Sequence, residues 1–362
     1  MRAVPLSLVR PGMRLGRTLF VGGRPYLRRG AEIRASYLPR LSRLGIRALF
    51  IEETNDDIQS LDELISDETR TAAFGAVAKA MRWAHQGTDL PMDDVTLAAD
   101  RIIDEILIKR DVLVHLSELR TVDDYTFAHS VSVCALAVLA GLQYGLRAGD
   151  LKTLAVGALL HDIGKMRVPG AIWTRSGALT AQEFEQVQAH AHYGFELLRR
   201  QHHISLLAAH VAYQHHERYD GSGYPRGLVG TEIHLYARIT AIADVYDALT
   251  SQEHPYRSAL SPMAAAEFLV NGRGVRFDPV LVNGFLQRIA LYPPGNWVRL
   301  SNGEVGVVVE YRKAAPRQPR VKMMHRPTQE VVDLATTPDL RIVEVSATDP
   351  DAEERVVPIP GR

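Results

Sequence analysis

The residues best suited to chemistry are histidines and aspartates in the middle of the chain. Of its 14 histidines, 11 lie between His129 and His254, whereas the 362 residues include a single cysteine. The adjacent pair His161-Asp162 offers an imidazole nitrogen and a carboxylate only a few ångströms apart, and such a carboxylate can bridge two metal ions. Further donors of the same two kinds flank this pair: His129, His190, His215, His216 and Asp244. Any one of these residues alone would be an ordinary core or surface residue, but seven together favour a site for a pair of metal ions.

The pattern resembles a known family. His129, His161-Asp162 and Asp244 are similar to the H…HD…D signature of the HD phosphohydrolase superfamily. The segment HHERYDGSGYP, residues 215–225, resembles the longer motif of its HD-GYP branch. The resemblance runs in the family's order from about Asp123 to Phe285. It includes Leu179-Thr180 with Glu183, His190-x-x-x-Gly194, and the run from Arg238 to Thr250.

The resemblance implies a helical domain with a buried metal centre that hydrolyses cyclic di-GMP to pGpG, and in some members to GMP. Some relatives in this family act on cyclic GMP-AMP instead. Carried over by position, the metal ligands would be His129, His161, Asp162, His190, His215, His216 and Asp244, with Asp162 bridging. The family's metals are usually iron or manganese, so two divalent ions of these kinds are the expected cofactors.

Phosphodiester hydrolysis explains why such residues would be needed. Two nearby metal ions lower the pKa of a bridging water, so that hydroxide is available near pH 7 and the in-line transition state is clamped. Asp162 and Lys165 are the expected catalytic residues, because an ammonium group at Lys165 can meet a phosphate oxygen. Lys165, Arg257 and Tyr224 are the expected substrate contacts.

Two departures from the family pattern bear on this expectation. Where some members carry a glutamate for a third metal, this chain has Tyr125, which favours a binuclear centre. The segment after Asp247 is one residue longer than usual and has His254 in place of an arginine, which puts substrate affinity in doubt. Three alternatives therefore stay open: a phosphodiesterase for another cyclic dinucleotide, a sensor that binds without cleaving, and a scaffold whose GYP loop contacts a diguanylate cyclase.

The sequence pattern around these residues predicts a mainly α protein. We expect a small β-containing module at 1–53, a helical connector at 54–122, an all-helical HD-type domain at 123–292, and a small β appendage with a flexible acidic tail at 293–362. Segment 87–91 breaks the connector into two helices, and Gly164 ends the helix before it. Asn302-Gly303 between apolar runs predicts a hairpin.

Composition narrows the function further. The chain has 42 basic and 42 acidic residues, which argues against a uniformly basic nucleic-acid binder. This balance hides a +10 block at 1–50, with eleven arginines and one acid, beside a −11 block at 51–124. The two blocks either dock together or form separate solvated faces.

Location and partners are also expectations of the sequence. A lone cysteine suits a reducing compartment, the start lacks the apolar core of a signal peptide, and the longest apolar stretch is shorter than a membrane span. We therefore expect a cytoplasmic protein without membrane insertion. The N-terminal module is a candidate for dimerisation, regulation or partner docking, so a homodimer is one expectation.

Overall fold

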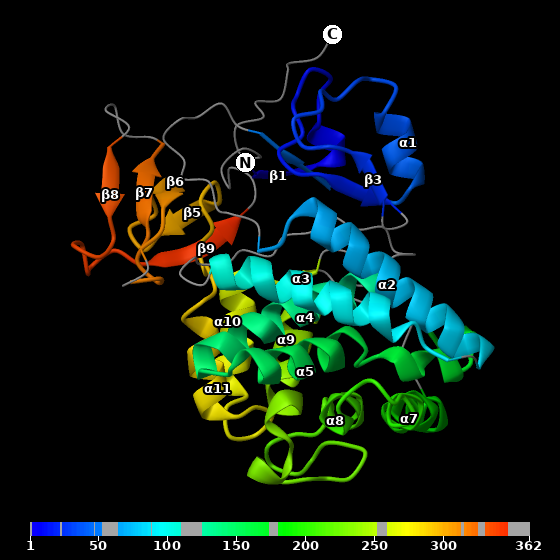
Figure 1. The fold of residues 1–362 in the computed structure, drawn as a ribbon. Coiled ribbons are helices and arrows are strands. Elements are labelled where there is room, and N and C mark those ends of the chain that lie inside the picture. The colour runs from blue at the N-terminus through cyan, green and yellow to red at the C-terminus, as the bar shows by residue number, and fades with distance from the viewer. Residues whose placement is uncertain are drawn as a thin grey trace.

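The computed structural model of the protein describes residues 2–21, 24–46, 48–52, 64–87, 89–109, 125–173, 180–251, 259–312, 315–324 and 330–346. Helices fill the middle of the chain and small sheets lie at its two ends (Figure 1), which confirms the predicted fold class. The predicted flexible tail from Thr348 lies outside the described residues.

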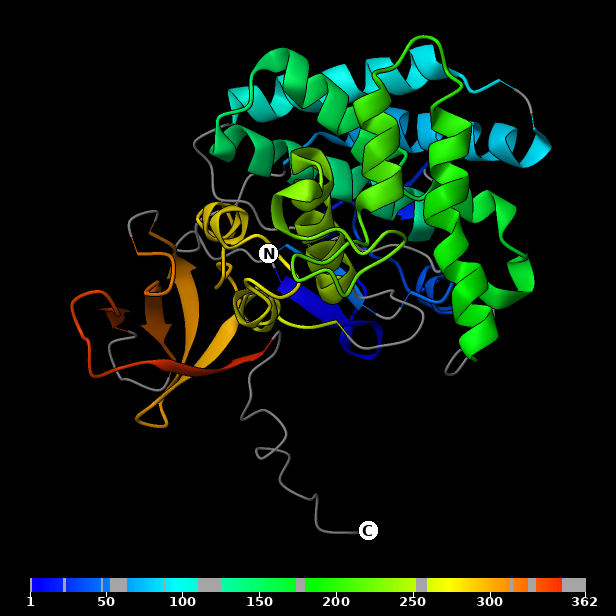
Figure 2. The ribbon, with the colours of Figure 1, turned by 90° about the horizontal axis from the view of Figure 1, so that it is seen from below.

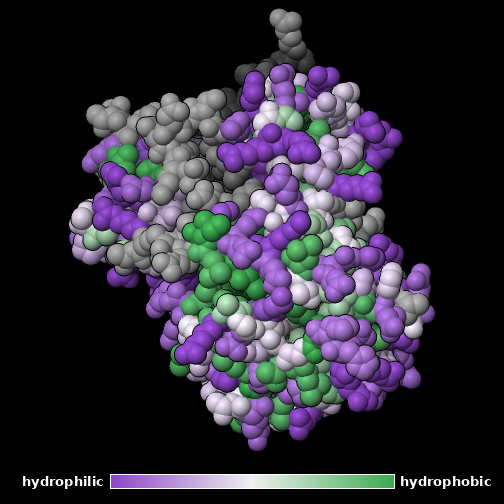
Figure 3. Space-filling model, in the orientation of Figure 1, coloured by the Kyte–Doolittle hydropathy of each residue, from purple (hydrophilic) through white to green (hydrophobic). Residues whose placement is uncertain are grey.

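The N-terminal module is built from two antiparallel pairs of strands around its own core. Strand β1 pairs antiparallel with β4, and β2 with β3. Their core is a cluster of aliphatic residues that includes Leu15, Leu41 and Leu49. Figure 3 shows hydrophilic side chains gathered over α1 and β3. The elements are β1 (Arg2–Pro5), η1 (Leu6–Leu8), β2 (Leu19–Val21), β3 (Arg24–Leu27), α1 (Leu38–Arg43) and β4 (Ala48–Ile51).

The helical part shares one continuous hydrophobic core. Helix α4 lies at its centre, packed against α5 and α9, while α7 and α8 pack on each other (Figures 1 and 2). The helices are α2 (Asp67–Gln86), α3 (Met92–Ile108), α4 (Tyr125–Tyr144), α5 (Ala148–Leu159), η3 (Ile163–Arg167), α6 (Gly170–Trp173), α7 (Ala181–Leu198), α8 (Leu206–Gln214), η4 (Gly230–Glu232), α9 (Leu235–Thr250), α10 (Pro262–Asn271) and α11 (Pro279–Leu286).

Helix α4 is apolar on every side because it is enclosed by other helices. Among the described residues, it is the one helix long and apolar enough to cross a membrane. However, 72% of its most apolar window is buried inside the protein, as expected for a central core helix. Its Cys134 is also buried there.

The connector helices α2 and α3 are joined where the sequence predicts a break. Gly87 ends α2 in the left-handed conformation, with φ of +74°, which glycine adopts without strain. At the other end of α2, the Glu105 carboxylate of α3 accepts hydrogen bonds from the backbone and hydroxyl of Ser66 and from the Thr69 hydroxyl. Both helices contribute to the same core as α4.

The C-terminal module is a five-stranded antiparallel sheet in the order β8-β7-β6-β5-β9. The predicted hairpin is present, because β5 pairs with β6 across a turn in which Gly303 has a φ of +86°. Two short strands, β7 and β8, were not expected from the sequence. Residues of this sheet belong to the helical core cluster. The strands are β5 (Trp297–Leu300), β6 (Val305–Glu310), β7 (Arg320–Met323), β8 (Val331–Asp333) and β9 (Ile342–Ser346).

The expected role of Gly164 as a helix stop is wrong. Helix α5 already ends at Leu159, and Gly164 lies inside η3, where the chain passes directly over α7. A Cβ added at Gly164 would lie 1.9 Å from the His190 carbonyl oxygen and 2.5 Å from the Gly194 backbone nitrogen. The glycine is therefore required for a backbone-to-backbone contact that sets Asp162 beside His190.

We predict that Gly164→Ala pushes η3 away from α7 and lowers the free energy of unfolding by about 1–3 kcal/mol or more, the usual cost of overpacking. Gly149→Ala is the matched control, since an added Cβ there meets nothing within 4 Å. Chemical denaturation of both variants checks the prediction. Equal stability of the two variants would contradict it.

Candidate metal centre

Five segments of the helical part bring the predicted ligands together. His129 comes from α4, His161 and Asp162 from the turn after α5, and His190 from α7. The remaining ligands are His215 and His216 at the end of α8, and Asp244 on α9. All seven positions therefore meet in the interior of the helical part, although they span more than one hundred residues of sequence.

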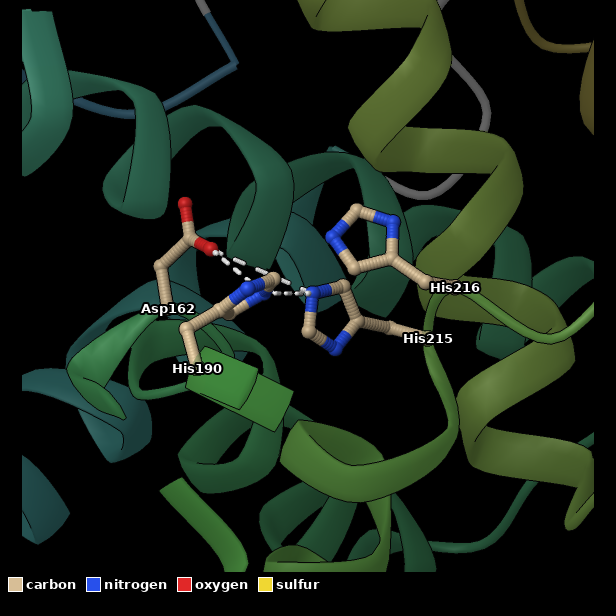
Figure 4. A group of neighbouring side chains, drawn as sticks. All are labelled: Asp162, His190, His215 and His216. Atoms are coloured by element: carbon tan, nitrogen blue, oxygen red, sulfur yellow. Dashed lines mark hydrogen bonds and ion pairs between the residues drawn. The ribbon is translucent and has the colours of Figure 1, made fainter. Parts of the chain in front are cut away.

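The seven side chains form two groups. In each group, every residue offers one ligand atom that lies within 4.8 Å of the others. Figure 4 shows the first group, in which three imidazoles from α7 and the end of α8 face the Asp162 carboxylate. The first group is Asp162, His190, His215 and His216, and the second is His129, His161 and Asp244.

Asp162 lies between the two groups. Its Oδ1 atom is 3.6 Å from His190 Nε2 and 3.9 Å from His215 Nε2, both in the first group. Its Oδ2 atom is 3.3 Å from His161 Nε2, in the second group. Each carboxylate oxygen therefore faces a different set of donors, which is the geometry a bridging ligand requires.

The ligand histidines are held in one tautomer by their other ring nitrogen. Since a carbonyl oxygen only accepts hydrogen bonds, an Nδ1 atom beside one must carry the proton, which leaves the Nε2 lone pair for a metal. This arrangement recurs at three histidines, each bonded to the carbonyl three residues earlier. The pairs are His161 with Ala158 (2.8 Å), His190 with Val187 (2.6 Å) and His215 with Ala212 (3.0 Å).

Two contacts show that the donor set fits metal ions. His190 Nε2 and His215 Nε2 lie 3.4 Å apart, and with both Nδ1 protons given to carbonyls neither nitrogen has a hydrogen to donate. A cation between two such lone pairs removes their repulsion. In addition, His161 Nε2 is buried and has no hydrogen-bond partner among the described residues, which is costly unless a ligand satisfies it.

Burial also favours the protonation states that metal ligands need. It lowers the pKa of His190 and His215, and together with the neighbouring His190 it lowers the pKa of His216 to about 3. Burial would raise the pKa of Asp162, but the charges of Lys165 and His161 outweigh it and hold that pKa well below its usual range. Near pH 7, three imidazoles are therefore neutral and the bridging carboxylate is ionised.

His129 is placed by two carboxylates of α9. Its Nε2 atom is 3.0 Å from Asp244 Oδ1, and its Nδ1 atom is 2.7 Å from Asp247 Oδ2. Burial opposes protonation of His129, but these hydrogen bonds raise its pKa to about 9. The sequence analysis missed the role of Asp247, although its three-residue spacing from Asp244 places both carboxylates on one helix face.

The GYP loop, which contains the motif at residues 215–225, folds around Glu217. Glu217 was not among the predicted site residues. The buried carboxylate of Glu217 accepts hydrogen bonds from the backbone N–H groups of Arg226 (2.8 Å) and Leu228 (3.0 Å). A Cβ at Gly223 would lie 2.2 Å from the Arg218 nitrogen, so only glycine fits that approach. The loop thereby places Tyr224 on the metal centre.

Two of the three predicted substrate contacts, Tyr224 and Lys165, lie at this centre. The third, Arg257, lies outside the residues that the structure describes. The Tyr224 ring stacks on His216, with centroids 4.8 Å apart. The Lys165 ammonium is 2.5 Å from Asp162 Oδ2, and its side chain is 23% exposed, so it lies where the centre meets solvent. Arg257, His254 and the Tyr125 side chain lie outside the described residues.

Arg218 and Asp220 follow the ligand pair His215-His216 in the chain. Both residues are exposed, and Asp220 accepts hydrogen bonds from the backbone and hydroxyl of Ser222, 2.9 and 2.7 Å away. This short turn shapes the loop rather than the metal centre.

Comparison with known proteins gives two family matches. A model described as HD domain matches residues 108–281, and a model described as KOW domain associated with HD domain matches residues 297–352. The first covers the metal centre and the second covers the C-terminal sheet.

Curated relatives extend the similarity over most of the chain. A cyclic di-GMP phosphodiesterase of Pseudomonas aeruginosa is 36% identical over 282 residues, which cover 75% of this chain and 68% of that protein. A cyclic di-GMP phosphodiesterase response regulator of Xanthomonas campestris is 41% identical over 46% of this chain and 44% of its own length. A 3′3′-cGAMP-specific phosphodiesterase of Vibrio cholerae is 31% identical over 75% of this chain and 60% of its own length.

We predict that Asp247→Asn weakens metal binding by about 10- to 100-fold, the usual effect of removing a carboxylate that orients a ligand histidine. Competition with a chelator of known affinity measures the change. Asp150→Asn is the control, because the Asp150 carboxylate accepts a hydrogen bond from the Tyr236 hydroxyl and touches none of the ligands. Unaltered metal affinity in Asp247→Asn would show that Asp247 does not position His129.

Proposed function

The chain belongs to the HD domain family, in its HD-GYP branch, and we propose that it hydrolyses cyclic di-GMP at the Asp162 centre. The products are pGpG and, by a second cleavage, GMP. The names of two relatives support this substrate.

The observation that carries the proposal is the position of the Asp162 carboxylate. One oxygen faces His190 and His215, and the other faces His161. A single buried side chain therefore joins two donor groups, as a binuclear hydrolytic site requires. When bound, two divalent ions would supply an activated water and positive charge beside the phosphate.

The side chains divide the remaining work. Neutral imidazoles hold the ions without cancelling their charge, and the carboxylates of Asp162 and Asp244 anchor them. Lys165 would turn its ammonium from the carboxylate toward a non-bridging phosphate oxygen of the substrate, where it balances negative charge. Tyr224 supports the imidazole of His216 by stacking on it.

The kind and number of the ions are also our proposal. Imidazole and carboxylate donors without a thiolate suit iron or manganese, and two donor groups suit two ions. Tyr125, in place of a third-site glutamate, is consistent with a binuclear centre.

The partners and the cellular location of the enzyme are also proposals. Ser222, Pro225 and Arg226 are exposed on the GYP loop, which supports docking of a diguanylate cyclase-type protein there. Homodimerisation through the N-terminal module and a cytoplasmic location are further proposals. The four-part division of the chain at residues 53, 122 and 292 stays a prediction.

We predict two metal ions per chain after anaerobic purification, and linear pGpG as the first product from cyclic di-GMP. Asp162→Ala removes the shared carboxylate, so it should lose most of the bound metal and all detectable hydrolysis. Metal analysis and chromatography of the products measure both effects. Asp104→Ala, an exposed aspartate on α3, should behave like the unaltered protein.

A substrate panel completes this test. Fewer than two ions per chain, with no linear product after loading with iron or manganese, would refute the proposal. Faster cleavage of cyclic GMP-AMP than of cyclic di-GMP would instead assign the chain to the other substrate class.

We predict that Lys165→Gln retains the bound metal but lowers kcat by about a hundredfold or more, the usual loss when one charge-stabilising donor is removed. Steady-state kinetics beside metal analysis separate the two effects. A variant that loses metal and activity together would show that Lys165 acts only by holding Asp162.

A further inference from the structure

An exposed phenylalanine lies next to Tyr224, the aromatic residue that stacks on the candidate ligand His216. Phe184, on the first turn of α7, is 48% exposed. Its position is fixed by the capping box that starts the helix, in which Thr180 and Glu183 hydrogen bond reciprocally. The ring is therefore held in solvent on a rigid element instead of being packed into the core.

A series of rings connects Phe184 to the candidate ligands. The Phe184 and Tyr224 rings meet edge to face, with centroids 6.3 Å apart and an interplanar angle of 79°. Tyr224 in turn stacks on His216 at 4.8 Å with an angle of 28°. Phe184 is thus separated from a candidate metal ligand by a single aromatic side chain.

The described centre provides for the phosphate of a dinucleotide but not for its bases. Its groups are donors for metal ions and the Lys165 ammonium. The ions that these donors would hold and the ammonium both act on negative charge. A nucleobase needs a flat apolar partner, and stacking on an aromatic side chain is the common solution. Phe184 offers such a surface, because its exposed ring lies beside Tyr224.

We propose that Phe184 stacks on one guanine base of the dinucleotide while the phosphate lies at the Asp162 centre. This inference rests on the proposed function, because it presumes a nucleotide substrate. Since every base has a π-face, stacking adds affinity without selecting strongly between guanine and adenine. Phe184 therefore favours purine dinucleotides over simple phosphodiesters, and does not choose between cyclic di-GMP and cyclic GMP-AMP.

The test is a comparison of Phe184→Ala with the unaltered protein. Removing the ring should raise KM for cyclic di-GMP by about 5- to 150-fold, the range seen when one base–aromatic stack is lost. The effect should fall on KM and leave kcat within about twofold, because the stack forms equally in ground and transition states. Phe184→Trp should restore KM. Tyr193→Ala is the matched control, an aromatic residue on the same helix that is 40% exposed.

A substrate without a nucleobase shows whether the rise in KM comes from lost base stacking. With an abasic analogue of cyclic di-GMP, which lacks both guanine bases and has no aromatic ring, Phe184→Ala should lose much less efficiency than with cyclic di-GMP. An unchanged KM for cyclic di-GMP would overturn the inference. Equal losses on both substrates would also overturn it, because they would show that Phe184 only supports Tyr224 and the metal ligands.

Binding of GMP separates this inference from the proposed function. Calorimetric titration of the metal-loaded protein with GMP needs no turnover of a cyclic dinucleotide. If the unaltered protein fails to cleave cyclic di-GMP, the proposed function fails, yet weaker GMP binding by Phe184→Ala still supports stacking. Equal GMP affinity in the two proteins would overturn it.

Discussion

A buried carboxylate placed between two groups of imidazoles is the constraint on which the structure of the centre depends. Asp162 is almost completely enclosed, and ionised side chains are costly in such a place unless charge or hydrogen bonds compensate. Lys165 and His161 supply part of that compensation. Cations held by the two donor groups would supply the rest of the compensating charge.

The helices around Asp162 are arranged to keep this centre rigid. Glycines at 164 and 194 let η3 and α7 touch through their backbones, so that Asp162 and His190 stand at a fixed distance. Carbonyl groups then select the tautomer of three histidines, and Asp247 holds the orientation of the His129 ring. These four histidines are therefore oriented before any ion binds, which reduces the entropy lost on binding.

Local signals in the sequence were enough to predict which side chains gather in the two donor groups, and several element boundaries. The His161-Asp162 pair, the break near Gly87 and the hairpin at Asn302-Gly303 depend on residues adjacent in the chain. Asp247 was missed because its partner, His129, is 118 residues away. The role of Gly164 was predicted wrongly because it depends on a backbone contact between η3 and α7, two segments that are not adjacent in the chain. Strands β7 and β8 are short, and their pairing depends on the sheet around them.

Anomalous X-ray diffraction from crystals of the iron- or manganese-loaded protein tests the central claim most directly. The account predicts two anomalous peaks, with one Asp162 oxygen on each ion, His190, His215 and His216 around the first, and His129, His161 and Asp244 around the second. A single peak, or two ions with Asp162 bound to only one of them, would contradict it.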